Sequence, residues 1–269
     1  MAALSFQTMP ASGEPGRFAD VRRREQTDST NADLLSLAAA GAPEGVVVVT
    51  DFQRSGRGRR GRTWMAPPGS ALLASVLFRP ALAPGAAHLV TMAAALAAAD
   101  ACGDVAGVQP GLKWPNDLVV ERAGMTAKLA GLLAESMVEG DRLEAVVVGM
   151  GCNLRAAPAG AVHLEDLAGR PVDRDELLAA WLVHLDERYP TPSEAGALLD
   201  DYRRRCTTLS RTVRVELEGA IFEGRAVDVT EDGHLLVNTV GGTRDVAAGD
   251  VVHLRPAEAT GPGRSPPDR

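Results

Sequence analysis

The sequence predicts an α+β fold in which a mixed β-sheet packs against helices and is followed by a small β-barrel of the SH3-like kind. Two apolar runs of strand length, 46–50 and 72–78, precede an alanine-rich helical stretch over 86–101, and this order indicates a helix packed closely on a sheet. After Thr207 the pattern changes to five short alternating segments separated by glycine-containing turns, which is typical of a small barrel.

The composition is that of an ordinary globular chain and argues against several classes of protein. With 269 residues, 45% hydrophobic and 23% charged, the chain can bury one sizeable core. We find no apolar run of the length expected of a bilayer span and no basic-then-apolar start, so we expect a cytoplasmic protein that binds no membrane. Three separated cysteines and five scattered histidines predict neither a disulfide framework nor a tightly bound metal.

The ends of the chain differ from its middle. Residues 1–20 and 257–269 are rich in Pro, Gly, Ser and Ala without any period, and we predict that they are disordered tails. We assign 21–206 to the main domain and 207–256 to the C-terminal barrel.

The elements of the main domain follow from their local patterns. A helix is predicted to begin after Ser29 or Thr30, either of which is a suitable N-cap, and to end at Gly41. Later in the chain we predict two strands, 128–138 and 143–151, joined by a tight turn at 139–141. Two helices are predicted after them, 173–189 and 194–205.

A loop of alternating glycine and arginine, 56–62, follows the first of these apolar strands and ends beside Trp64. The chain has a net charge of -7, so this cluster of positive charge is predicted to face a negative partner. Glycine allows close backbone approach, and guanidinium groups offer paired donors to phosphate or carboxylate. The pattern alone also fits a solvated loop or a nucleic-acid-binding segment, although its place inside the folded region argues against disorder.

Lys113 and Lys128 are the only lysines among the 28 basic residues. Proline inside 113–117 predicts that Asn116 and Asp117 lie on a turn at a strand end, where catalytic polar groups often occur. Lys128 begins an apolar segment, so its charge indicates a bound anion. The alternatives are a simple hairpin turn at 116–117 and a strand-end lysine that reaches solvent.

The segment 148–153 closes the strand predicted over 143–151 and contains two glycines, Gly149 and Gly151. Glycine at these positions allows a ring or another backbone to approach closely, or else marks a bulge at a sheet edge, and the sequence leaves both possibilities open.

Five motifs in a fixed order resemble those of the biotin protein ligase family, the biotin–[acetyl-CoA-carboxylase] synthetases. They are Asp28-Ser29-Thr30-Asn31, Gln53 followed by 56–62 and Trp64, Lys113-Trp114-Pro115-Asn116-Asp117, 128–135, and Gly149-Met150-Gly151-Cys152-Asn153. The resemblance extends from about Asp28 to Arg255. It implies a mixed-sheet biotin/lipoate ligase catalytic domain, similar to class II synthetases, over 21–206, and an SH3-like C-terminal barrel.

The resemblance also implies a reaction in two steps. Biotin and ATP, with Mg²⁺, would give biotinyl-5′-AMP and pyrophosphate, and a lysine of the biotin carboxyl carrier protein of an acyl-CoA carboxylase would then take the biotinyl group. Such an enzyme needs no covalent nucleophile, because positioning and charge stabilisation perform the catalysis.

Roles for individual residues follow from the matching motif positions. The resemblance implies that the biotin site consists of Ser29, Thr30, Asn31, Gln53, Gly56, Arg57, Lys128 and Gly131. It implies that ATP or the adenylate is bound by Arg57, Arg59, Trp64, Asn116, Asp117, Lys128 and Asn153. Lys128, Arg59 and Arg57 would act in catalysis, Asp117 would bind Mg²⁺, and Arg60 and Arg62 would form only a solvated flank of the loop.

Bifunctional members of the family carry an N-terminal DNA-binding domain of roughly 60 residues, the lower end of domain size. Fewer than thirty residues precede Asp28 here, so we expect a ligase that is not a repressor and has no DNA partner. The alternatives are a lipoate-type ligase, which would lack the arginine loop and 113–117, and a nucleic-acid-binding protein that uses the arginine loop.

Overall fold

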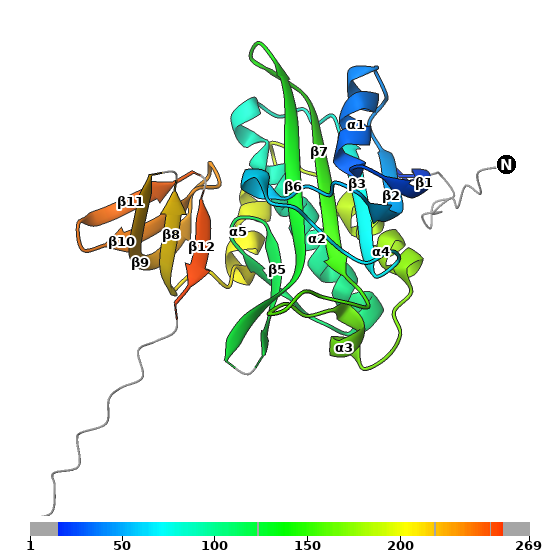
Figure 1. The fold of residues 1–269 in the computed structure, drawn as a ribbon. Helices are drawn as coiled ribbons and strands as arrows, with labels where there is room; N and C mark the ends of the chain where they lie inside the picture. Colours follow the sequence, from blue (N-terminus) through cyan, green and yellow to red (C-terminus); the bar gives the residue numbers. More distant parts are fainter. Residues whose placement is uncertain (1–15, 123, 218, 248, 255–269) are drawn as a thin grey trace, which may run out of the picture.

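The computed structural model describes residues 16–254 except 123, 218 and 248, and in these residues the chain forms two β-sheets (Figure 1). Most of the two predicted tails lies outside the described residues. The N-terminal boundary at 20 is wrong, because Phe18 is buried and its ring lies 5.3 Å from that of Phe78. Strand β1, Asp20–Thr27, follows at once and was not predicted, because its charged sequence lacks an apolar period.

The larger sheet has seven strands in the order β1-β2-β3-β7-β6-β5-β4. Only the β1–β2 pair is parallel, which makes the sheet mixed, as predicted. The other strands are β2 Val46–Gln53, β3 Ala71–Phe78, β4 Gly111–Lys113, β5 Asp117–Arg122, β6 Met125–Glu139 and β7 Arg142–Asn153.

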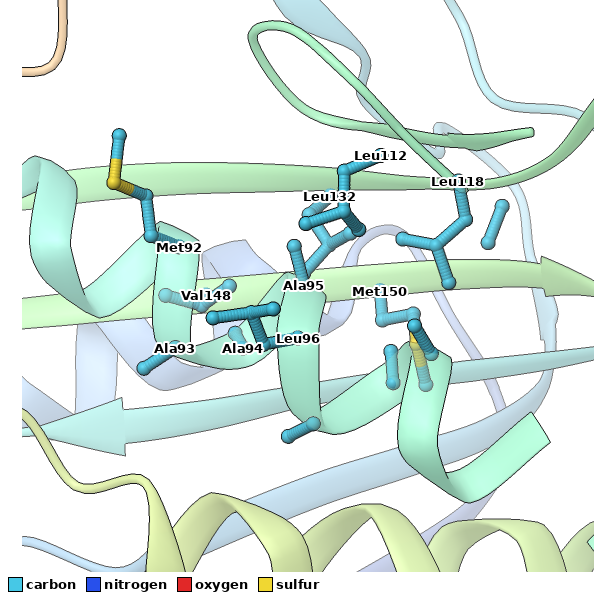
Figure 2. Packing of buried hydrophobic residues seen from close by; sticks show 14 of the residues in the cluster. Met92, Ala93, Ala94, Ala95, Leu96, Leu112, Leu118, Leu132, Val148 and Met150 are labelled. Atoms are coloured by element: carbon cyan, nitrogen blue, oxygen red, sulfur yellow. The ribbon is translucent and has the colours of Figure 1, made fainter. Parts of the chain in front are cut away.

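Helix α2, His88–Ala106, packs along one face of this sheet. Figure 2 shows its Ala93–Leu96 turn against Leu132, Val148 and Met150 of the sheet. The alanines bring the helix axis close to the strands, as the sequence predicted. The helix continues past the predicted end at 101 and stops at Gly107, whose φ of 69° ends it in the left-handed region.

The segment Pro84–Ala106 is long and apolar enough to cross a membrane, contrary to our expectation that no such run exists. In the fold, 78% of its apolar window is buried inside the protein. In this structure its apolar side chains form part of the hydrophobic core.

Helix α1, Thr30–Ala39, packs on the opposite face of the sheet, where Leu34 and Ala38 contact Val46, Val48 and Leu77. Ser29 is its N-cap, because the Ser29 hydroxyl accepts a hydrogen bond from Ala32 N. Residues of β2 alternate between the two faces, since Val47 and Val49 belong to the core under α2.

Three further helices follow β7, and α4 and α5 pack against α2. They are α3 Leu164–Ala168, α4 Arg174–Glu187 and α5 Ala195–Arg205. Five strands then form an antiparallel sheet in the order β11-β10-β9-β8-β12, so the five predicted strands are confirmed. They are β8 Thr212–Leu217, β9 Ala220–Val229, β10 Leu235–Thr239, β11 Gly242–Val246 and β12 Asp250–His253.

Trp114 joins the two sheets. Its indole Nε1 donates to Gly233 O at 3.0 Å, and its backbone N donates to the hydroxyl of Thr208 at 3.0 Å. The same hydroxyl lies 3.1 Å from Nε2 of His253 in β12. The Trp114 motif therefore fixes the C-terminal sheet on the main domain, next to the turn that carries Asn116 and Asp117.

Candidate active site

A pocket with a volume of about 140 Å³ lies on the sheet face opposite α2. Its lining comes from the start of α1, the end of β2, the arginine loop, and strands β5, β6 and β7. Eleven of the predicted site residues line it: Ser29, Thr30, Asn31, Gln53, Arg57, Arg59, Trp64, Asn116, Asp117, Lys128 and Gly131. Two others, Gly56 and Asn153, do not.

Glycines on adjacent strands create the floor. Gly151 of β7 pairs with Gly131 of β6, and a Cβ on Gly151 would lie 2.4 Å from Cε2 of Trp64. A Cβ on Gly149 would lie 2.2 Å from Oδ1 of Asn31. Because β7 is an inner strand between β3 and β6, these glycines serve close approach and not an edge bulge.

Gln53 and Thr30 form one wall. The Gln53 Oε1 atom accepts hydrogen bonds from Thr30 N at 2.9 Å and from the Thr30 hydroxyl at 3.1 Å. The amide nitrogen of Gln53 therefore faces the other way, toward Gly56, where a Cβ would lie 3.0 Å from it. Gly56 is buried beneath the pocket wall, and its Cβ would also lie 2.4 Å from Trp64 O.

Asn31 is buried and its side chain is bound within the protein. Its Nδ2 donates to Leu133 O at 3.1 Å and to Oε2 of Glu135 at 2.9 Å. Its Oδ1 accepts from the hydroxyl of Ser75 at 2.6 Å. Both N–H groups of Asn31 are therefore used, so this residue shapes the pocket without a donor left for a ligand.

Sequence reasoning missed Ser75 and Glu135, which support the pocket from behind. Ser75 is the single hydroxyl in the apolar strand β3 and is fully buried. Glu135 is an acid that follows the apolar run of β6. A polar residue in an otherwise apolar strand was the available signal, but its partners on α1 lie far away in sequence.

The arginine loop closes the pocket as a short hairpin, which we call the arginine lid, residues 56–64. Trp64 N donates to Gly56 O at 2.9 Å, and Gly58 N donates to Arg62 O at 2.7 Å. At its tip Arg60 has a φ of 55°, an uncommon conformation for a residue with a side chain.

Three lid arginines, Arg57, Arg59 and Arg62, line the pocket. Arg57 Nη1 lies 3.3 Å from Oε1 of Glu135. Arg59 Nη1 lies 3.5 Å from Oδ1 of Asn116 and 3.4 Å from Gly249 O. Burial lowers the pKa of Arg59 below its ordinary value, although nearby carboxylates act in the opposite direction.

Arg60 and Arg62 contact the C-terminal sheet, so the prediction that they form only a solvated flank is wrong. Arg60 donates to Glu216 O at 2.8 Å, and Arg62 pairs with Asp250 at 2.5 Å. These contacts are between residues distant in sequence, which a local pattern cannot reveal. They place the C-terminal sheet against the tip of the lid.

Lys128 and Asp117 form an ion pair across β5 and β6, with Nζ 2.7 Å from Oδ1. Lys128 Nζ also lies 5.4 Å from the centre of the Trp64 ring, and its side chain is 38% exposed. Within the described part of the chain, Nε1 of Trp64 is buried and has no hydrogen-bond partner. The pocket is therefore lined by an ammonium group, three guanidinium groups and an unused indole donor.

Asn153 lies at the end of β7, outside this pocket, and its Nδ2 donates to Val162 O at 3.1 Å. It lines a neighbouring apolar pocket of about 520 Å³ together with Phe52, Met65 and Pro158. The two pockets adjoin, because Gln53 and Thr63 line both.

Comparisons with known proteins agree with this arrangement. Residues 24–153 match the model of the biotin/lipoate A/B protein ligase family, and residues 208–254 match that of the biotin protein ligase C terminal domain. The first match spans every strand and motif from the lid to Asn153, and the second spans the five-stranded sheet.

The similarity to named relatives covers most of the chain. The biotin–[acetyl-CoA-carboxylase] ligase of Mycobacterium tuberculosis is 41% identical over 86% of this chain and 87% of its own length. The ligase of the same name from Paracoccus denitrificans is 34% identical over 84% and 97%. A biotin protein ligase from Aquifex aeolicus, solved with biotin and ATP, has the same fold, with a TM-score of 0.70, 24% identity and coverage of 89% and 100%. The chain therefore belongs to the biotin protein ligase family.

Proposed function

We infer that this protein is an ATP-dependent ligase that converts biotin to biotinyl-5′-AMP and joins the biotinyl group to a lysine of a biotin carboxyl carrier protein of an acyl-CoA carboxylase. One observation carries the inference. Arg57, Arg59 and Lys128 converge on one glycine-floored pocket whose far wall is the Gln53–Thr30 pair. The names of the relatives and the complex of the structural neighbour support this substrate pair.

The wall formed by Ser29, Thr30 and Gln53 suits the ureido group of biotin. With its oxygen held by Thr30, Gln53 can donate its amide N–H groups to a carbonyl oxygen. Gly151 allows the Trp64 ring to lie close to the floor, where it can cover an apolar bicyclic ring.

Lys128 and Arg59 are proposed to stabilise charge during adenylation. A carboxylate oxygen of biotin attacks the α-phosphorus, a new O–P bond forms, and the bond to the β-phosphate oxygen breaks so that pyrophosphate leaves. Lys128 stands between the floor and Asp117, and its compact ammonium can contact both the carboxylate and the α-phosphate. Fixed cations in a partly dry site can supply a large part of the rate enhancement.

The apolar pocket beside Asn153 is proposed to hold the adenine base, because it adjoins the charged pocket and combines apolar walls with the two amides of Gln53 and Asn153. Mg²⁺ is proposed to arrive with the triphosphate. Asp117 alone, already paired with Lys128, fits the usual pattern in which Mg²⁺ takes one or two carboxylates plus phosphate oxygens.

In the second step a neutral lysine amine of the carrier attacks the acyl carbon of the adenylate. The amide bond forms, AMP leaves, and the amine loses a proton.

The three cysteines are free and buried, which is compatible with the reducing cytoplasm that remains our predicted location.

The test is transfer of biotin to a purified apo carrier domain with ATP and Mg²⁺, measured by the mass of the carrier. We expect a mass increase that depends on both biotin and ATP, and none when lipoate replaces biotin. Labelling with lipoate instead of biotin would favour the lipoate-type alternative. Binding to duplex DNA that falls with salt, without any labelling, would favour the nucleic-acid alternative; the pocket-facing and sheet-facing lid arginines argue against it.

A further inference from the structure

We propose that Glu135 is a positioning residue that couples the floor of the pocket to the arginine lid and thereby retains the adenylate. This proposal rests on the proposed function, since the adenylate is the species that the lid would retain. Glu135 does not line the pocket, so its effect would act through Arg57 and Asn31.

The two oxygens of the Glu135 carboxylate have different partners. Oε2 accepts from the buried amide of Asn31 at 2.9 Å, and Oε1 accepts from the guanidinium of Arg57 at 3.3 Å. One carboxylate on β6 therefore bridges the start of α1 and the lid.

The floor side of the bridge is fixed. Asn31 is also held by Ser75 and by Leu133 O, and both Asn31 and Ser75 are buried. Gly149 leaves only enough space for the Asn31 amide, because any Cβ there would overlap it. Because Asn31 is held by these contacts, it offers Oε2 of Glu135 a hydrogen-bond donor in a fixed position.

On the lid side of the bridge, Arg57 can exchange hydrogen bonds to Glu135 for hydrogen bonds to a ligand. The Arg57 side chain is 52% exposed and that of Glu135 is 28% exposed, so their pairing is solvent-accessible and weak. A guanidinium has five N–H donors, so Arg57 can keep one bond to Glu135 while others turn to an anion in the pocket. Glu135 thereby holds Arg57 at the mouth before and after the adenylate forms.

Three variants test the proposal. In E135Q the carboxamide oxygen can still accept from Asn31, but its NH₂ group would face the donors of Arg57, so only the lid side is lost. R57A removes the other partner, and E135Q/R57A combines both. The matched control is E139Q, which changes an exposed acid on the same strand. The measurement is the rate at which preformed biotinyl-5′-AMP leaves the protein when no carrier is present, alongside melting temperature.

We expect E135Q to release the adenylate about two- to five-fold faster than wild type, the range expected when an exposed ion pair is lost. E135Q/R57A should be no faster than R57A alone, and E139Q should behave as wild type. Wild-type release from E135Q, or additive effects in the double variant, would overturn the proposal. Failure of the proposed function is distinct, because then wild-type protein would form no adenylate at all.

Discussion

Lys128 Nζ lies 2.7 Å from Oδ1 of Asp117, and both side chains line the pocket under the arginine lid. The lysine thus has a carboxylate partner within the protein, and it also stands beside Trp64 and the glycine floor. A negatively charged ligand would meet an ammonium that is already oriented. This relationship is the physical basis for assigning charge stabilisation to Lys128.

Lys128→Ala should reduce adenylate formation by about 10²- to 10³-fold, the loss typical when one oriented charge-stabilising donor is removed. The protein should remain folded, because the Lys128 side chain is partly exposed and Asp117 can be solvated. Biotin-dependent ATP–pyrophosphate exchange is the measurement, with R142Q, an exposed cation on β7, as the control. Normal exchange in Lys128→Ala would refute the role assigned to this residue.

Gly151→Ala should weaken biotin binding strongly, because its methyl group would lie 2.4 Å from the Trp64 ring and force the lid outward. Titration calorimetry with biotin would measure the loss. Gly85→Ala is the matched control, since a Cβ there meets nothing within 4 Å. Equal biotin affinity in both variants would mean that the Trp64 ring does not contact the ligand.

The lid should become protected when ligands bind. Without ligand the tip is held by exposed contacts of Arg60 and Arg62, which are individually weak. Adding biotin and ATP should slow trypsin cleavage after the lid arginines, because the guanidinium groups of Arg57 and Arg59 gain an anionic partner. Identical cleavage rates with and without the ligands would show that the lid does not close over them.

His253 should make docking of the C-terminal sheet sensitive to acid. Burial lowers its pKa to about 4, with Lys113 and Arg211 acting in the same direction. Between its ordinary pKa of about 6.5 and this value the unfolded state binds the proton and the folded state does not. The free energy of unfolding should therefore fall as pH drops from about 6.5 toward 4, and the contribution of neutral His253 is fully present above that range.

His184 affects the pH dependence of the free energy of unfolding in the opposite direction, because its acidic neighbours raise its pKa despite partial burial. The effect of His253 is therefore isolated by comparing wild type with H253Q. Denaturant unfolding at pH 7.5 and pH 5 measures the difference. H253Q should lose less stability on acidification than wild type. An equal loss in the two proteins would show that His253 does not titrate in this range.

The sequence predicted most of what local patterns can encode. The apolar runs of β2 and β3, the alanine-rich α2 and the alternation after Thr207 located the sheets, and the motif order located eleven pocket residues. Strand β1 was missed because an exposed edge strand carries little apolar signal.

The partners of individual side chains were beyond prediction from the sequence. Ser75 and Glu135 bond to α1 across more than forty residues of chain, and Arg60 and Arg62 reach a second sheet. Such contacts depend on how distant elements meet, and they explain why Asn31 supports the pocket and why the flank of the lid is bound to β8 and β12.

The most direct test of the account is the identity of the small molecule held by the protein after incubation with biotin, ATP and Mg²⁺ in the absence of carrier. Denaturing the washed protein and measuring the released compound by mass spectrometry should give biotinyl-5′-AMP from wild type and far less from Lys128→Ala. Release of unmodified biotin and ATP alone from wild type would contradict the central claim that this pocket makes and retains an adenylate.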